Sequence, residues 1–447
     1  MQQKLPTLAV HWNTTPLARI LGPMQEFIHQ SQSSGIILLI MTVVALVIAN
    51  SPLRTWYMAF LEAHVGITAG PLVLDESVLH WVNDGLMALF FFVVGLEIKR
   101  EVLVGELANL RAATLPILAA VGGVLVPAGI YFLLNRDGDA ARGRGVPMAT
   151  DIAFALGCLA LLGNRVPLGL KIFLTAVAIV DDLMAVLVIA IFYASGLHLA
   201  WLGVGLGVLV LLALANVFGL RSPIIYGSLG VLVWLAFLHS GVHATIAGVL
   251  VALTIPARRQ INAPTFLARA HGILRHFEAS QGEEPKRQAE VQQSAVLELE
   301  EACEQVQAPL QKMEHALHTW VAFAIMPIFA FANAGVALSA SSVGRESLPV
   351  LLGIVLGLTL GKPIGIVGAA WLAVRSGVAE LPQGVNWQHM LGVGVLAGMG
   401  FTMSLFIASL AFANPDTLAT AKLAILLASL LAGVIGFILL RRVPQAE

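Results

Sequence analysis

Charged side chains are scarce in this sequence of 447 residues. Aspartate, glutamate, lysine and arginine make up 11% of the chain, whereas soluble domains carry roughly 25%. Hydrophobic residues make up 58% of it. This balance excludes an ordinary soluble domain and indicates an all-α polytopic membrane protein.

Cysteines and basic tracts are scarce as well. Of the two cysteines, Cys158 falls in a predicted span and Cys303 in a predicted cytoplasmic segment, so we expect no disulfide. The formal net charge is −1 and no basic tract is interleaved with aromatic residues, so we expect no nucleic-acid partner. We expect no cofactor. No cleavage site follows an early apolar core, so the first span is expected to remain as a signal-anchor.

Long apolar runs are what the sequence does have, and about 20 such residues cross a bilayer. Twelve windows predict about twelve transmembrane helices, near residues 35–49, 78–98, 113–134, 146–162, 172–194, 200–218, 223–239, 242–255, 319–337, 348–374, 389–412 and 418–440. The chain is thereby divided into an N-terminal segment (1–34), eight spans (35–255), a polar connector (256–318), four spans (319–440) and a tail (441–447).

The lysine and arginine counts predict the orientation of the spans. With a cytoplasmic N-terminus, the short inside segments hold eleven of these residues and the outside loops hold five. Because positive charge accumulates on the inside, both termini are expected in the cytoplasm.

Two segments outside the spans have a character of their own. The sequence of the connector, 256–318, has acidic runs and a pattern that predicts amphipathic helix. We expect a partly helical, mobile cytoplasmic segment. The outside loop 64–77 has two short β-prone runs around Ala69-Gly70-Pro71, which predict a hairpin. A lone hairpin is marginal in water, so we expect it to pair with that of a second subunit in a homodimer.

The fifth window carries two adjacent carboxylates, Asp181 and Asp182, near its middle. A charge at that depth costs at least about 2.5–3.5 kcal/mol, so buried carboxylates indicate function. Helical neighbours point about 100° apart, so both can border one cavity. The pair predicts a cation or proton site within a transporter.

Other ionisable residues lie in the apolar windows too. They are Asp84, Glu97, Asp151 and, in the tenth window, Lys362. We expect Lys362 to pair with a buried aspartate, and a purely structural salt bridge stays the alternative. Pro363 follows it and predicts a local kink.

The fourth and eleventh windows have the features of broken helices. The fourth is short and contains Thr150 and Asp151, and the eleventh contains Gly398 and Gly400. Such spans in corresponding halves of a transporter indicate half-helices that meet at a midplane site. Asp151 would offset facing N-terminal ends, Lys362 would offset C-terminal ends, and backbone near Thr150 would supply oxygen ligands.

A second group of titratable residues lies at predicted cytoplasmic helix ends. It consists of Glu97, Arg100, Glu101, Glu314, His315 and His318. Histidine titrates in the physiological range, so this group is a candidate pH-response cluster, with interfacial salt bridging as the alternative. His243, at the outer end of the eighth window, is expected to be a packed, hydrogen-bonded histidine.

Seven motifs occur in the order in which one transporter family has them. They are NDGLMALFFFVVGLEIKREV, PMATDIAFALG, AIVDDLMAVLVIAIFY, SGVHATIAG, FAFANAG, GKPIG and GMGFTMSLFIASLAF. The sequence closely resembles the NhaA family of bacterial sodium/proton antiporters. It departs from the pattern in its long connector and in Thr319, where members commonly have proline.

The resemblance implies a twelve-helix fold with inverted repeats, spans three to five against ten to twelve, in the bacterial inner membrane. It implies that Na⁺, and Li⁺ as well, binds at Asp181 and Asp182 in exchange for H⁺, with Lys362 as the partner of Asp181. It places Thr150 and Asp151 at the helix crossing. Glu97, Arg100, Glu101, Glu314 and His315 map onto the family's pH-response region, and 64–77 onto its dimer-forming hairpin.

Three other classes are weighed against this reading. An intramembrane aspartyl protease needs aspartates on separate helices, and no GxGD sequence is present. A channel needs a selectivity filter, and no repeat of that kind is visible. A proton-coupled transporter of another cation or small ion is the nearest alternative, and an organic anion is less favoured because we take Lys362 to be the one buried cation.

Overall fold

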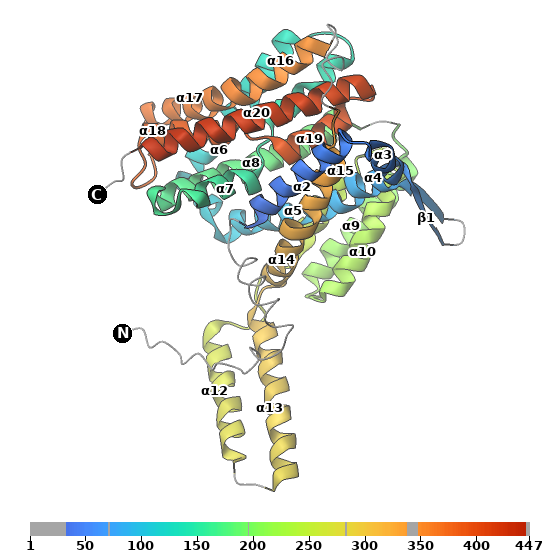
Figure 1. The fold of residues 1–447 in the computed structure, drawn as a ribbon. Coiled ribbons are helices and arrows are strands. Elements are labelled where there is room, and N and C mark those ends of the chain that lie inside the picture. The colour runs from blue at the N-terminus through green and yellow to red at the C-terminus, as the bar shows by residue number, and fades with distance from the viewer. Residues whose placement is uncertain (1–32, 70–71, 195, 282–283, 338–346, 444–447) are drawn as a thin grey trace.

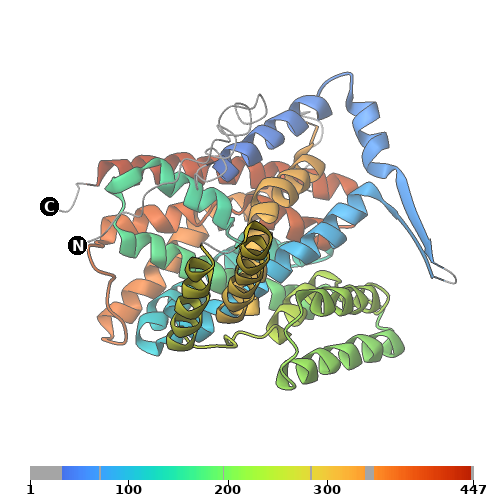
Figure 2. The ribbon, with the colours of Figure 1, turned by 90° about the horizontal axis from the view of Figure 1, so that it is seen from below.

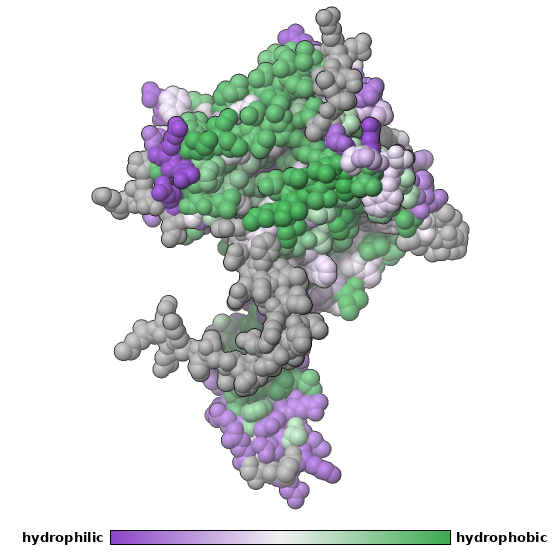
Figure 3. Space-filling model, in the orientation of Figure 1, coloured by the Kyte–Doolittle hydropathy of each residue, from purple (hydrophilic) through white to green (hydrophobic). Residues whose placement is uncertain are grey.

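The computed structural model describes residues 33–69, 72–194, 196–281, 284–337 and 347–443. Nearly all of this is helix, because a chain that crosses hydrocarbon must satisfy its backbone hydrogen bonds within each segment. The helices long enough to reach across a bilayer form one bundle (Figure 1). Figure 3 shows an apolar surface that runs across this bundle between polar groups at its two ends.

The elements follow one another along the chain, and where a helix changes type the parts are given separately. They are α2 (Ser33–Ala49), α3 (Arg54–Glu62), β1 (His64–Ala69), β2 (Leu72–Ser77), α4 (Val78–His80), η2 (Trp81–Leu86), α5 (Met87–Val104), η3 (Glu106–Ala108), α6 (Leu110–Leu134), η4 (Asp139–Met148), α7 (Ile152–Leu161), η5 (Gly163–Arg165), α8 (Leu168–Phe192), α9 (Leu199–Val217), α10 (Pro223–Leu238), α11 (Thr245–Thr254), α12 (Ala263–Ala279), α13 (Pro285–Val306), α14 (Pro309–Trp320), η6 (Val321–Ile325), α15 (Met326–Ala334), α16 (Leu348–Leu356), η9 (Gly357–Gly361), α17 (Lys362–Arg375), α18 (Trp387–Leu396), α19 (Phe401–Ala411) and α20 (Pro415–Arg442).

Each of the twelve apolar windows coincides with one helix or with a run of helices. Within the described residues, seven helices are long and apolar enough to span a membrane, or nine if each of two bent pairs is one span. One bent pair is α18 and α19, which meet at 45°. The all-helical polytopic fold is confirmed, and the number twelve stays a prediction.

The helix that opens the ninth span begins earlier than the apolar window does. α14, η6 and α15 form one candidate span over Pro309–Ala334, whereas the window began at 319. The residues before 319 belong to α14, an amphipathic helix with only part of its surface buried, and such a helix does not register as an apolar run.

Two helices of the connector, α12 and α13, pack side by side and project from the bundle (Figures 1 and 2). They enclose a small core of their own with Ile273, Ala295 and Ala302. Arg269 of α12 donates to Gln305 Oε1 at 2.9 Å and joins the two helices near their base. The structure therefore shows that the connector is helical.

The loop at 64–77 forms the hairpin that its sequence predicts. β1 and β2 pair antiparallel, with His64 opposite Ser77 and Ala69 opposite Leu72. Residues 70–71 of the predicted turn lie outside the described residues. The hairpin projects from one side of the bundle (Figure 2), and its pairing with a second subunit stays a prediction.

Candidate functional site

Two breaks in the helices meet at the centre of the bundle. One is the extended stretch before α7, and the other is the link between α18 and α19. The backbone N–H of Asp151 donates to Met399 O at 2.7 Å. This bond ties the two breaks together, so chain segments about half the protein apart in sequence form one crossing.

Glycines allow this close approach of backbones. A Cβ added at Gly398 would lie 2.3 Å from the carbonyl oxygen of Leu358 in η9. One added at Gly400 would lie 2.1 Å from the Ser404 hydroxyl oxygen and 3.0 Å from the carbonyl oxygen of Ala149. The backbone carbonyl of Leu358 cannot move aside as a side chain can, so the crossing requires glycine at position 398, whereas a Cβ at position 400 would displace the Ser404 side chain.

Asp151 offsets the N-terminal ends of both half-helices. Its Oδ1 accepts from the backbone N–H of Phe154 in α7 at 3.1 Å. Its Oδ2 accepts from the backbone N–H of Thr402 in α19 at 3.1 Å and from the Thr402 hydroxyl at 2.5 Å. Helix N-termini carry roughly half a positive charge each, so a carboxylate between two of them is stabilised.

Lys362 occupies the complementary position. Its side chain is fully buried, and its ammonium donates to the carbonyl oxygen of Met148, the last residue of η4. It also pairs with Asp181, with Nζ 2.7 Å from Oδ2. The structure thus brings Lys362 to both a C-terminal helix end and a buried aspartate, as its sequence position predicts, and this aspartate is Asp181, as the resemblance implies.

Thr150 connects Asp181 to the crossing. Its hydroxyl oxygen lies 2.8 Å from Asp181 Oδ2 and 3.0 Å from Ala397 O. A threonine hydroxyl has a single proton to donate, so it is shared between these two acceptors or switches between them. Protonation or ion binding at Asp181 would change which acceptor the hydroxyl serves.

Asp182 faces a different environment from its neighbour. It is 1% exposed, and it lines a cavity of about 440 Å³ together with Glu97 and Asp151. Oδ1 of Asp181 and Oδ1 of Asp182 find no hydrogen-bond partner among the described residues. Buried carboxylate oxygens normally have partners, so these two are candidate ligands for a cation.

The cavity extends from Asp182 toward the predicted cytoplasmic helix ends. Its other polar lining residues are Ser34, His318 and Thr319. His318 is exposed, so the cavity is open at that end. The arrangement provides a path along which an ion could reach a buried carboxylate from one side of the bundle.

Part of the predicted pH-response cluster forms a salt-bridge network. Arg100 contacts Glu101 at 2.8 Å on its own helix and Glu314 at 2.5 Å on α14. Glu97 is not in this network but lines the cavity with His318. His315 lies on the exposed side of α14. The structure therefore brings five of the six residues to the network or to the cavity wall.

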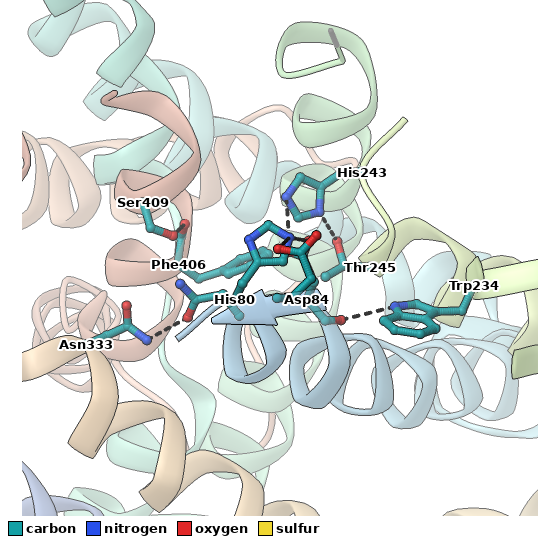
Figure 4. Close-up of polar contacts among 10 residues, drawn as sticks. His80, Asp84, Trp234, His243, Thr245, Asn333, Phe406 and Ser409 are labelled. Carbon is teal, nitrogen blue, oxygen red and sulfur yellow. Dashed lines mark hydrogen bonds and ion pairs between the residues drawn. The ribbon is translucent and has the colours of Figure 1, made fainter. Parts of the chain in front are cut away.

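Asp84 and His243 belong to a separate polar cluster at the predicted outer end of the bundle (Figure 4). Asp84 Oδ2 lies 3.0 Å from His80 Nε2, and Asp84 Oδ1 lies 3.7 Å from His243 Nε2. The other ring nitrogen of His243 is 2.9 Å from the Thr245 hydroxyl. His243 is thus packed and hydrogen-bonded, as predicted, and neither residue lines the cavity at Asp182.

Three residues that contribute to this architecture were not predicted from the sequence. Thr402 binds Asp151, as described above. Lys99 donates to the carbonyl oxygens of Leu253 and Ile255 at 2.6 and 2.5 Å and so caps the end of α11. Lys422 lies in α20 and is only partly exposed. Among the described residues Lys362 is the one lysine or arginine with a buried side chain, as expected, although the twelfth apolar window contains a second, partly exposed lysine.

Comparison with known proteins identifies the family. Residues 25–440 match the family model described as Na⁺/H⁺ antiporter 1. The chain is 51% identical over 427 residues to the Na(+)/H(+) antiporter NhaA of Oleidesulfovibrio alaskensis, covering 95% of each chain. It is 48% identical to the protein of that name from Koribacter versatilis, covering 96% of this chain and 93% of that one. It is also 48% identical to the Na(+)/H(+) antiporter NhaA 1 of Saccharophagus degradans, covering 95% and 92%. These similarities extend over nearly the whole length of every chain compared, and the protein therefore belongs to the Na⁺/H⁺ antiporter 1 family.

Proposed function

We propose that this protein exports Na⁺, and Li⁺ as well, in exchange for inward H⁺ across the bacterial inner membrane. One observation carries the proposal. Asp182 and Asp181 each have a buried oxygen that finds no partner in the described part of the chain, and a cavity connects Asp182 to one face of the bundle. The family and the names of its relatives support this function.

The two carboxylates would hold the ion and the proton in turn. Small alkali cations are hard and prefer oxygen ligands, and a carboxylate must lose its proton before it coordinates one. A cation approaching through the cavity would meet Asp182 before Asp181, because Asp182 lines the cavity and Asp181 does not. Na⁺ and H⁺ would therefore exclude each other at Asp182.

The Lys362–Asp181 pair would supply a second proton-linked step. A cation that coordinates the free Oδ1 of Asp181 draws on the charge of the same carboxylate and weakens its attraction for the ammonium of Lys362 at Oδ2. Once unpaired, a fully buried ammonium is costly, and loss of its proton relieves that cost. If one Na⁺ displaces two protons in this way, each cycle moves net charge and responds to the membrane potential.

The crossing would allow the site to face each side in turn. Half-helix ends at midplane are held by side chains, and in such folds one bundle rocks against the other around a fixed site. In this chain Asp151, Thr150 and Lys362 hold those ends, so they would also transmit the charge state of Asp181 to the half-helices. The Arg100–Glu314 bridge, between α5 and α14, is the contact we propose for regulation by cytoplasmic pH.

We further propose that the protein is a homodimer joined through β1 and β2, with both termini in the cytoplasm. The hairpin stands clear of the bundle (Figure 2), and a two-stranded sheet needs a further partner for stability.

Transport in everted vesicles tests the function. A pH gradient is formed by respiration, and the recovery of a pH-sensitive dye is measured after addition of NaCl, LiCl or KCl from pH 6 to 9. We expect Na⁺ and Li⁺ to collapse the gradient and K⁺ to have no effect, with activity rising with pH. Collapse by K⁺ would instead support a transporter of another cation. No response from vesicles that contain the folded protein would contradict the proposal.

A further inference from the structure

A second large cavity lies away from the transport site. Its volume is about 890 Å³, and it is formed by the first turns of α6, the first turns of α8 and the stretch after α17. These are all helix ends that the charge distribution assigns to the cytoplasmic surface. The cavity therefore lies where the headgroups of the inner leaflet meet the protein.

Three charged side chains line the cavity. They are Arg111, Glu106 and Glu380. None of the three takes part in an ion pair within the described residues. One cationic and two anionic groups thus border the same space without neutralising one another.

The rest of the lining is largely apolar. Leu115 and Phe173 are buried in the wall of the cavity, while Ile172 and Val378 lie at its exposed edge, with Val378 60% exposed. Exposed apolar side chains beside charged ones are typical of the membrane interface, where a ligand has a polar head and a hydrocarbon tail. A water-soluble metabolite would leave this apolar edge uncovered.

We propose that this cavity binds a phospholipid with a primary-amine headgroup, of the phosphatidylethanolamine class. The phosphate would accept from the guanidinium of Arg111, which presents paired donors suited to phosphate oxygens. The ammonium would donate to Glu106 and Glu380, and the acyl chains would cover Ile172 and Val378.

The charges select this class over other lipids. An anionic headgroup without an amine would still bind Arg111 through its phosphate, but its negative charge would lie beside two carboxylates with no ammonium between them. A quaternary choline group has no N–H to donate, so it would leave both carboxylates without a hydrogen bond. All three charged side chains are exposed, and exposed ion pairs are weak, so the two carboxylates together should favour the amine headgroup by about fivefold in affinity.

Native mass spectrometry of the delipidated full-length protein tests the proposal. Phosphatidylethanolamine, phosphatidylcholine and phosphatidylglycerol with identical acyl chains are added in turn, and bound lipid is counted. We expect phosphatidylethanolamine to be retained about fivefold more strongly than either of the others. Equal retention of the three, preference for phosphatidylglycerol, or no retained lipid would overturn the proposal.

Variants assign the binding to this cavity. Arg111→Ala should weaken all three lipids, whereas Glu106→Gln with Glu380→Gln should abolish only the preference for the amine. Arg136→Ala and Glu62→Gln, both on exposed residues outside the cavity, are the matched controls. Unchanged retention in the cavity variants would contradict the assignment. Because binding is measured without transport, this result is independent of the proposed exchange activity.

Discussion

Lys362 and Asp181 form a fully buried ion pair, with Nζ 2.7 Å from Oδ2, between helices that are far apart in the sequence. Asp181 Oδ2 also accepts from Thr150, while its Oδ1 stays unpartnered among the described residues. Oδ2 of Asp181 therefore has two hydrogen-bond donors, whereas its Oδ1 has none in the described part of the chain. Such an arrangement holds the protein together and leaves one coordination position for an ion.

Removing one member of the pair should destabilise the protein more than removing both. Lys362→Ala leaves a buried carboxylate without its cation, a loss typically of about 3–5 kcal/mol. Asp181→Asn combined with Lys362→Leu leaves no charge and should recover much of that loss. Melting temperatures of the purified single and double variants, measured in the same detergent, test this. If the loss of stability in the double variant equalled the sum of the losses in the two single variants, the two residues would not be coupled.

Thr402→Val should weaken the crossing, because valine has the shape of threonine but its side chain cannot donate to Asp151, and only the backbone N–H of residue 402 still does. Loss of a hydrogen bond to a buried charged group costs about 1.5–3 kcal/mol, so we expect lower thermal stability and slower exchange. Thr402→Ser keeps the hydroxyl and is the matched control. If valine and serine variants behaved alike, the contact of 2.5 Å would have no role in holding the half-helix.

Gly398→Ala should impair transport, because the added methyl group would lie 2.3 Å from the Leu358 carbonyl oxygen. Overpacking of this kind costs about 1–3 kcal/mol, and the shift of the crossing should reduce exchange roughly tenfold or more. Gly368→Ala is the control, because no atom lies within 4 Å of a Cβ at that position. Exchange rates in vesicles with equal amounts of each variant provide the measurement. A Gly398 variant as active as the Gly368 variant would show that the link tolerates a wider separation.

Glu314→Gln should move the pH of half-maximal activity upward by about 0.5 unit. Glutamine resembles the protonated carboxyl, which cannot form the ion pair with Arg100, so the variant should behave at each pH as the native protein does at a lower pH. Glu304→Gln is the control, since Glu304 pairs with Lys312 in an exposed position. The activity of both variants is measured in vesicles from pH 6 to 9. A profile that does not move, or moves downward, would exclude Glu314 from the pH response.

The positions of the buried charges could be read from the sequence because their cost in hydrocarbon is high. An apolar window containing Asp181, Asp182 or Lys362 must face the protein interior. Glycines in short spans likewise indicated where helices break. The pairing of Lys362 with a buried aspartate, and the place of Asp151 at two helix ends, followed from these constraints. That this aspartate is Asp181 was implied only by the family resemblance.

Other parts of the site depend on the tertiary arrangement and left no local signal. Thr402 and Asp151 are 251 positions apart, and nothing in the sequence around Thr402 distinguishes it from a packed core threonine. Lys99 is one of several charged residues at a helix end, and its role as a cap for α11 appears only when the two helices are placed side by side. The sharing of the Thr150 hydroxyl between two acceptors is likewise visible only in the structure.

The association of α12 with α13 could not be predicted from the sequence either. Their acidic and amphipathic character predicted helix but not which faces meet. Ala295 and Ala302 are seven residues apart and form the seam with Ile273. Phe266, Phe277 and Leu299 pack against this seam, and an amphipathic pattern identifies the apolar face of each helix but not the helix that covers it.

Proton release on Na⁺ binding tests the central claim most directly. Purified protein in weak buffer near pH 8 is mixed with NaCl, and a soluble pH indicator reports the protons released by the native protein and by Asp182→Asn. Asp137→Asn, at an exposed position in the loop after α6, is the control. We expect the native protein and the control to release protons on addition of Na⁺ and the folded Asp182 variant to release none. Equal release from the native protein and the Asp182 variant would show that Na⁺ and H⁺ do not compete at this carboxylate.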